Sequence, residues 1–262
     1  MRTRYQRHLL DKSYQILGNY LNKTGSTSQA TTYLDTASNI RAGILDLFWD
    51  SSKLSYYDFN LTSNGRNNVY TPAAFYPFWV GVIPSEVLND QTKAFGAFSS
   101  VNMVLNRYNG TFPSSFIATG LKWDLPNAWP PHQYIALQAL RSLPSNLTTN
   151  TMPSGQSYGL VPSGQLGLSE LQLPAQPIRG TNGKTTRTDI SKLNGTVVNG
   201  GAAVDGEGWG QALQRQLANR YTAAVFCSWW ATGGSIPSIL PRRLNRELNL
   251  TRSLNNTGNV RC

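Results

Sequence analysis

Apolar residues recur at helical spacing over three long stretches of the chain. Over residues 5–21 and 29–49 they fall three or four positions apart, as they do on one face of an amphipathic helix. The same spacing returns over residues 211–231, in a stretch rich in Ala, Leu and Gln. The pattern therefore predicts three long helices, two near the N-terminus and one in the last quarter of the chain.

Prolines and turn residues bound several shorter elements. Residues 54–61 are rich in aromatic side chains and predict an extended segment or short strand, followed by a turn at Asn64-Gly65. Pro72 suits the first position of a short, almost wholly apolar helix, which we expect to be buried. Pro130-Pro131 begins another helix with apolar residues at helical spacing, and Pro144 ends it.

Two further helices and one irregular segment complete the predicted order. Ser85 has the side chain of an N-cap and predicts a helix that runs to about Asn106. Residues 145–203 are rich in Ser, Thr, Gly, Pro, Asn and Gln, and predict a polar loop excursion on the surface. A last helix is expected over residues 242–255. Because helix follows helix, the predicted fold class is all-α, built from packed helix pairs.

Composition narrows the class of protein. The chain has 262 residues, of which 40% are hydrophobic and 11% aromatic, so it can bury a sizeable core and is not disordered throughout. No uninterrupted apolar stretch reaches the roughly 18 residues that crossing a bilayer needs, so we expect no membrane-spanning segment. The basic N-terminus has no apolar run of the length found in signal peptides.

The net charge of +10 does not by itself indicate nucleic acid binding. The basic residues are scattered, and no RNA- or DNA-binding signature accompanies them, so we expect no nucleic acid partner. The chain has two cysteines, Cys227 and Cys262, which match neither a zinc-binding spacing nor a disulfide framework. Acidic residues are the scarcer group, since only 13 residues are Asp or Glu. Carboxylate chemistry therefore has few candidates.

The segment from Lys122 to His132 has the most unusual composition. It contains two Trp, three Pro, one Asp and one Asn in eleven residues. The prolines restrict the backbone, so we expect a rigid loop that leads into a helix. Aromatic faces stack on the C–H side of sugar rings, and carboxylate and amide groups bind hydroxyls, so the segment suits a carbohydrate. A buried Trp/Pro corner is the alternative, and composition leaves both open.

The same segment carries a resemblance to a known family. WDLPNAWPP, residues 123–131, closely resembles the second signature of the trehalase family, commonly written QWDYPNAWPP. Lys122 stands where the family usually has Gln, and Lys can donate but not accept a hydrogen bond. DLFWDSSKLSYYDFNL, TPAAFYPFWVG and GEGWGQALQRQLANRYTAAVFCSWWATGG resemble other family segments in the same order. The last of these resembles a helix of the fungal members.

This resemblance implies an inverting glycoside hydrolase that splits α,α-trehalose into two glucose units without a metal or organic cofactor. It also implies an (α/α)6 barrel. Residues 1–262 would then be a single partial catalytic domain, incomplete at both ends, with trehalose or glucose as its ligand. By the match to the signature, Trp123, Asp124, Asn127 and Trp129 are the candidate substrate-binding residues.

The catalytic groups of the family have no counterpart in this sequence. Inverting hydrolysis needs two carboxyl groups, roughly 6.5 to 9.5 Å apart. The resemblance implies an acid in a Glu-Ser/Thr-Gly-Trp-Asp motif and a base in a Gly-Gly-Glu-Tyr motif, and neither motif occurs here. Glu207 lies in a Gly-rich acidic loop, but an acid before a helix also favours the positive end of the helix dipole. We therefore expect a structural role for Glu207, assign no catalytic residue and expect no hydrolysis by this chain alone.

The remaining expectations concern partners and location. A non-catalytic carbohydrate-binding or regulatory protein is the alternative to a fragment of an enzyme. Helix faces of a partial barrel would be left apolar, so a complementary N-terminal trehalase segment is an expected partner. The sequence contains seven Asn-X-Ser/Thr sequons, which fit an extracellular or cell-wall glycoprotein as the parent enzyme. They begin at Asn22, Asn60, Asn109, Asn146, Asn194, Asn249 and Asn255.

Overall fold

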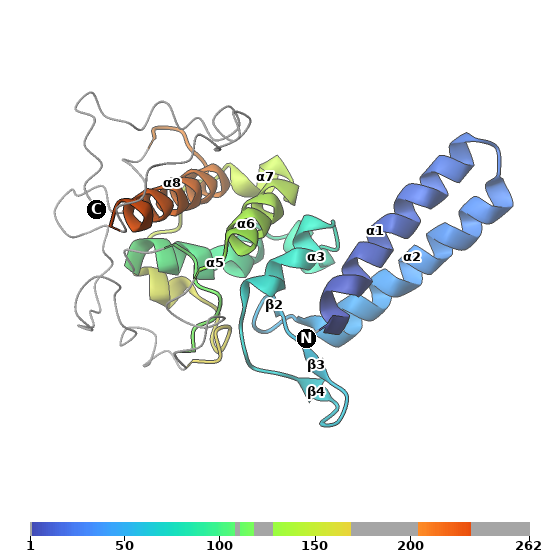
Figure 1. Ribbon diagram of the computed structural model, residues 1–262, viewed down its shortest axis with the longest axis horizontal. Coiled ribbons are helices and arrows are strands. Elements are labelled where there is room, and N and C mark those ends of the chain that lie inside the picture. The colour runs from blue at the N-terminus through green and yellow to red at the C-terminus, as the bar shows by residue number, and fades with distance from the viewer. Residues whose placement is uncertain (1, 108–110, 118–127, 169–203, 232–262) are drawn as a thin grey trace.

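The computed structural model describes residues 2–107, 111–117, 128–168 and 204–231 (Figure 1). Helices dominate these ranges, and the strands within them are four two-residue elements in two small antiparallel pairs. The all-α prediction is therefore confirmed. None of the helices in these ranges combines the length and the hydropathy that crossing a membrane requires.

The first two helices form an antiparallel hairpin that projects from the rest of the molecule (Figure 1). Helix α1 spans Arg2–Lys23 and α2 spans Thr27–Phe48, which confirms both helices predicted for this region. Gly25 joins them with a φ of +87°, a conformation that glycine adopts without steric cost. Small residues let the two helices pack closely, because Gly18 and Ala30 are buried between them.

Two short β-hairpins follow, where the sequence predicted an extended segment and a turn. Strand β1 (Trp49–Asp50) pairs with β2 (Ser55–Tyr56), with Trp49 opposite Tyr56. Strand β3 (Phe59–Asn60) pairs with β4 (Gly65–Arg66), with Phe59 opposite Arg66. Asn64, which has a φ of +49°, makes the predicted turn between β3 and β4.

An aromatic core fills the body of the molecule. The 3-10 helix η1 (Pro72–Phe75) and helix α3 (Tyr76–Trp79) form the predicted buried apolar element and pack against α6 (Pro130–Ser142). Phe75 stacks on Phe98 with ring centroids 5.1 Å apart, and Phe98 lies 6.4 Å from the ring of Trp209. These side chains are almost fully buried, so aromatic packing holds the central helices together.

The helix predicted over residues 85–106 is two helices. Helix α4 is a single turn, Ser85–Leu88, and α5 spans Gln91–Arg107. Pro84 rather than Ser85 occupies the N-cap position of α4. The Oδ1 of Asp90 accepts hydrogen bonds from the backbone N–H groups of Thr92 and Lys93, and so caps α5. The prediction placed one N-cap at Ser85 and missed the second helix start that Asp90 makes within the polar run at residues 89–93.

The polar stretch that begins at residue 145 contributes to the core over its first part. It contains α7 (Ser145–Thr148) and η2 (Ser157–Leu160), and it buries Leu147, Val161 and Leu166. The Nε2 of the buried Gln165 donates to the carbonyl oxygens of Lys53 and Gly96, at 2.9 and 3.1 Å. Residues 145–168 therefore differ from the expected surface excursion. Residues 169–203 lie outside the described residues.

Helix α8 (Trp209–Ala231) confirms the helix predicted near the C-terminus and packs across α5 and α6 (Figure 1). Its N-terminal turn is anchored, because the backbone N–H of Trp209 donates to the carbonyl oxygen of Asn150 at 2.8 Å. The helix expected over residues 242–255 and the side chain of Cys227 lie outside what the structure describes.

Candidate functional site

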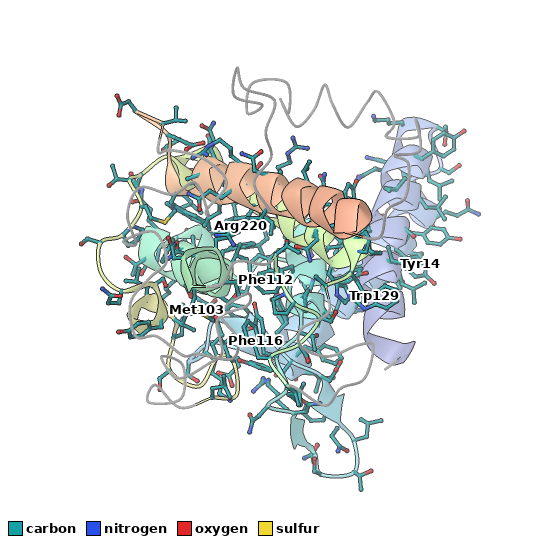
Figure 2. All side chains as sticks on the ribbon, turned by 60° about the vertical axis from the view of Figure 1, so that its left-hand side comes forward. Tyr14, Met103, Phe112, Phe116, Trp129 and Arg220 are labelled. Carbon is teal, nitrogen blue, oxygen red and sulfur yellow. The ribbon has the colours of Figure 1, made fainter. Side chains whose placement is uncertain are left out.

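The signature segment is described only at its C-terminal end. Trp123, Asp124 and Asn127 lie outside the described residues. Trp129 is half-buried, and it occupies the N-cap position of α6 with an extended backbone at φ −111° and ψ 135° (Figure 2). Its carbonyl oxygen accepts hydrogen bonds from the backbone N–H groups of His132 and Gln133. The end of the segment is thus fixed to the first turn of α6, as expected from Pro130.

Residues 111–117 lead into the signature segment and are almost entirely buried. The rings of Phe112 and Phe116 lie 6.5 and 6.0 Å from the ring of Tyr70. The hydroxyl of Tyr70 is in turn hydrogen-bonded to Ser100 on α5, at 2.7 Å. Burial raises the pKa of Tyr70, so this hydroxyl keeps its proton at neutral pH.

Gln133 joins the start of α6 to residues 111–112, which precede the signature segment. Its side chain is 1% exposed and lies between α6 and residues 111–112. The Oε1 accepts hydrogen bonds from the Thr111 hydroxyl and from the backbone N–H of Phe112, while the Nε2 donates to the carbonyl oxygen of Phe112 at 2.6 Å. Both polar atoms of this amide therefore hold residues 111–112 against the first turn of α6. The sequence did offer a signal, because Gln133 shares a helix face with Leu137 and Leu140.

Two groups that can carry positive charge lie close to this frame. His132 is half-buried, and burial lowers its pKa, so the imidazole is neutral at pH 7. Arg220 on α8 is 4% exposed, and its Nη2 donates to the carbonyl oxygen of Leu105. Burial lowers the pKa of Arg220 to about 10, so the guanidinium stays charged at neutral pH. Sequence reasoning missed Arg220, although it continues the buried helix face of Leu213 and Leu217.

Glu207 forms an ion pair just before helix α8. The Nε of Arg215 donates to Oε1 and Oε2 at 2.9 and 3.2 Å, and the Nη2 donates to Oε2 at 2.8 Å. The carboxylate is also largely buried, with 10% of the side chain exposed. Such a bidentate pair closes the loop at residues 204–208 onto α8. This arrangement agrees with a structural role for Glu207.

Other carboxylates in the described ranges also have structural partners. Glu86 accepts the indole N–H of Trp49 at 2.6 Å, and Asp11 is paired with Arg41 at 3.6 Å. Asp50 accepts hydrogen bonds from Ser52 and from the backbone of Lys53. Burial acts to raise the pKa of Asp50, but these hydrogen bonds and the Lys53 charge outweigh it, and the pKa is lowered. Among the described residues, no cluster of three or more His, Cys, Asp or Glu could hold a metal ion.

Comparison with known proteins identifies the family. The sequence model of the trehalase family matches residues 8–155, which is more than half of the chain. The protein is therefore, by descent, of the glycoside hydrolase class. Within that class the chain belongs to the trehalase family.

Individual relatives agree with this assignment. The chain is 30% identical to a trehalase of Oryctolagus cuniculus over 139 residues, and 32% identical to one of Pimpla hypochondriaca over 133 residues. These matches cover 53% and 51% of this chain and 23% of each relative, so the chain spans about a quarter of their length. Among solved structures, neutral trehalase Nth1 from Saccharomyces cerevisiae matches at a TM-score of 0.43 and 17% identity, over 92% of this chain and 42% of that chain.

Proposed function

We propose that this chain binds α,α-trehalose through Trp123, Asp124, Asn127 and Trp129, as part of a trehalase that hydrolyses the sugar to glucose. The observation that carries the proposal is the frame around the signature segment. Gln133 joins the two flanks of the segment, and Trp129 is fixed at the start of α6. Fixed residues on either side of a binding segment lower the entropy that the segment loses when it binds a sugar.

We further propose that residues 1–262 alone bind the sugar without cleaving it. An inverting glycosidase needs one carboxyl group to protonate the leaving oxygen and another to activate water. Glu207 is held in an ion pair by Arg215, and Glu86 accepts a hydrogen bond from the Trp49 indole. These partners support structural roles for the two glutamates, and the remaining catalytic groups would come from other trehalase sequence.

Two measurements on the purified chain test these proposals. Calorimetric titration with trehalose should give saturable heat, and an assay for released glucose should give none. Trp129→Ala should weaken binding about tenfold, whereas Trp79→Ala, a half-buried tryptophan on α3, should leave the affinity unchanged. Absence of heat would contradict sugar binding. Glucose release at a rate near that of longer trehalases would contradict the inactivity of the chain.

The exposed apolar residues of α1 lead us to propose a protein partner for this chain. Leu9, Ile16 and Tyr20 lie seven and four residues apart on α1, a spacing that places them on one helix face, and they are 50%, 60% and 62% exposed. An apolar helix face of this length is typical of a surface that another element covers. We expect a helix of a complementary trehalase segment to cover it, as in a barrel built from helix pairs. Light scattering should then show association of this chain with a recombinant trehalase segment that carries the Glu-Ser/Thr-Gly-Trp-Asp motif.

The alternative function is a carbohydrate-binding or regulatory protein without chemistry. The observation that favours it is the engagement of Glu207 and Glu86 by structural partners. Mixing the chain with the complementary segment separates the two functions. Recovery of glucose release in the mixture would indicate an enzyme fragment, whereas trehalose binding without recovery would indicate a binding protein. The seven sequons lead us to propose an extracellular or cell-wall location for the enzyme.

A further inference from the structure

A hollow of about 320 Å³ lies beside the β3–β4 hairpin, away from the signature segment in the sequence. Its polar lining comes from Asp58, Asn60, Asn67 and Thr71, and its apolar lining includes Phe59 and Val69. The volume is at the small end of the range for ligand pockets, about 300 to 1,000 Å³, and suits one small ring. A lining of two amides, a carboxylate and a hydroxyl around an aromatic ring suits a polyhydroxylated ligand better than an apolar one.

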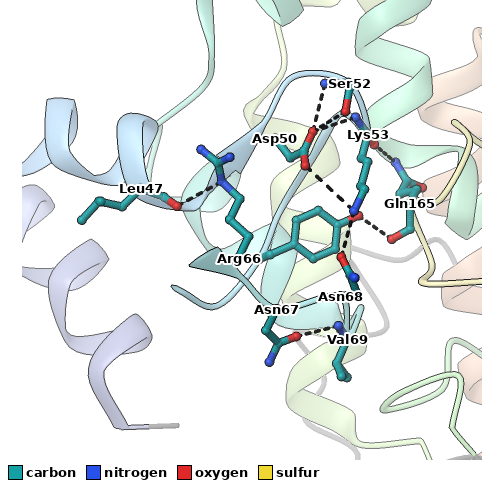
Figure 3. Close-up of polar contacts among 10 residues, drawn as sticks. Leu47, Asp50, Ser52, Lys53, Arg66, Asn67, Asn68, Val69 and Gln165 are labelled. Carbon is teal, nitrogen blue, oxygen red and sulfur yellow. Dashed lines mark hydrogen bonds and ion pairs between the residues drawn. The ribbon is translucent and has the colours of Figure 1, made fainter. Parts of the chain in front are cut away.

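The two amides of the hollow have fixed orientations. The Oδ1 of Asn60 accepts the backbone N–H groups of Thr62 and Ser63, at 2.8 and 3.3 Å. The Oδ1 of Asn67 accepts the backbone N–H of Val69 (Figure 3). Because each oxygen is used inside its own turn, the amide N–H groups are the atoms left to meet a ligand. The hollow thus offers two positioned donors next to the acceptor oxygens of Asp58 and Thr71.

The backbone around these side chains is braced from several directions. The backbone N–H of Asn67 donates to the carbonyl oxygen of Asp58 at 2.8 Å. Arg66 donates to the carbonyl oxygens of Asp46 and Leu47 at the end of α2, at 2.7 and 3.1 Å. Tyr70, between Val69 and Thr71, is buried in the aromatic core. The walls are therefore held in place by protein contacts, so a ligand finds the donors already arranged.

We propose that this hollow is a second saccharide-binding site, which takes one hexose ring. The ring lies against Phe59, its hydroxyls accept hydrogen bonds from the amide groups of Asn60 and Asn67, and they donate to Asp58. The choice of trehalose and glucose as ligands rests on the proposed function of the chain. The chemistry of the hollow requires only a ring with several hydroxyl groups.

Methyl groups in the hollow give a local test. In chain 1–262 labelled at Val and Thr methyl groups, titration with trehalose and then with glucose should shift the NMR signals of Val69 and Thr71 to saturation. The signals of Val104, buried in α5, and of Thr31, exposed on α2, should stay in place. Absence of a saturable shift at both Val69 and Thr71 overturns the proposal.

Two substitutions at neighbouring positions test the Asn67 side-chain amide as a hydrogen-bond donor to the sugar. Asn67→Asp keeps the oxygen that accepts the Val69 N–H but removes the amide donor, and should weaken the binding seen at Val69 about three- to tenfold. Asn68→Asp makes the same change of charge one position away, outside the hollow, and keeps the oxygen that binds Lys53. Asn68→Asp should leave the affinity unchanged. Equal affinities for the two variants would contradict the role of Asn67.

A second variant covers the case in which Asn67→Asp disturbs the turn. Thr71 occupies the N-cap position of η1 without a side-chain capping hydrogen bond, so Thr71→Val removes the hydroxyl and little else. It should weaken sugar binding at Val69 severalfold.

Trp129→Ala tests whether the hollow binds sugar independently of the signature segment. Loss of calorimetric binding in Trp129→Ala with retained shifts at Val69 supports the hollow as an independent site, whereas loss of both signals contradicts it.

Discussion

The α1–α2 hairpin and the body of the molecule are packed by different means. In the hairpin the helices approach through Gly18 and Ala30, and the interface contains a buried carboxylate, Asp11, paired with Arg41. In the body the helices meet through large rings such as Phe98 and Trp209, which pack within 6.4 Å of each other. The hairpin leaves apolar side chains of α1 in solvent, whereas the central rings of the body, such as Phe75, Phe98 and Trp209, are almost fully buried.

This difference indicates which part of the chain has the more extensive buried contacts. Ring packing and buried hydrogen bonds, such as those of Gln133, hold the described helices of the body together. Small-residue contacts let two helices lie close together, but they bury little apolar area and leave the outer face of α1 uncovered. We therefore expect the stability of the chain to depend on the body much more than on the hairpin.

The largest expected effect is that of Trp209→Ala. The indole is 1% exposed, packs against Phe95 and Phe98, and donates its N–H to the carbonyl oxygen of Leu147 at 2.9 Å. Its removal leaves a cavity and an unsatisfied carbonyl, and should lower the free energy of unfolding by about 4 kcal/mol. Urea denaturation measures this loss. Tyr134→Ala, at a ring that is 53% exposed, is the control and should cost less than about 1 kcal/mol.

Gln133→Ala should have the next largest effect. The change leaves the Thr111 hydroxyl and both backbone groups of Phe112 without the partner that they have in the buried interior, and should cost about 3 kcal/mol. Gln214→Ala removes a partly exposed amide that accepts a hydrogen bond from Arg141, and should cost about 0.5 kcal/mol. Equal losses in the two variants, measured in urea, would show that the body does not depend on the Gln133 contacts.

Two glycine substitutions examine the hairpin by itself. A Cβ at Gly18 would lie 2.8 Å from the Cγ of Leu34 and 3.2 Å from the carbonyl oxygen of Ala30, so Gly18→Ala should destabilise by about 1 kcal/mol. At Gly43 the added Cβ would meet no atom within 4 Å apart from its chain neighbours and the adjacent backbone of α2, and Gly43→Ala should stabilise α2 by about 0.5 to 1 kcal/mol. Thermal unfolding followed by circular dichroism measures both. An increase in stability in both variants would show that the close packing of α1 against α2 at Gly18 does not contribute to stability.

The smallest expected effect is a pH dependence at His132. Burial lowers its pKa in the folded chain, so the unfolded chain binds more protons as the pH falls through the ordinary histidine range. Stability from this group is therefore complete above the unfolded pKa of about 6.5 and decreases as the pH falls below it. His132→Gln should flatten the dependence of the unfolding free energy on pH between about 5 and 7. An unchanged slope would assign the dependence to other groups.

The sequence predicted the elements whose pattern is local. Prolines and apolar spacing gave α1, α2, α6 and α8, because periodicity and the N1 preference of proline act within one element. The break between α4 and α5 was missed because Asp90, which caps α5, lies only five residues after the N-cap candidate Ser85, and the two helices were predicted as one. Burial within residues 145–168 was also missed, since a polar composition conceals residues such as Gln165 that satisfy distant backbone groups.

The candidate site could be predicted in part. Its signature residues were assigned by resemblance and remain a prediction, and the structural role of Glu207 was expected from its position before a helix. The Arg215 partner that holds Glu207 was not predicted, because a contact eight residues away depends on how the loop folds back. The hollow at Asn67 was not predicted either, since its lining joins the end of α2 to strand β3 and to the segment that follows β4, and depends on turn geometry.

The contacts of Gln165 bear on how this chain can be divided experimentally. The family match ends at residue 155, yet the Tyr57 hydroxyl donates to the carbonyl oxygen of Gln165, and the Gln165 amide donates to Lys53 and Gly96. A recombinant product cut at residue 155 would keep every matched position and lose these buried contacts. Limited proteolysis should therefore leave residues 156–168 joined to the protected core, and expression boundaries belong beyond Leu168.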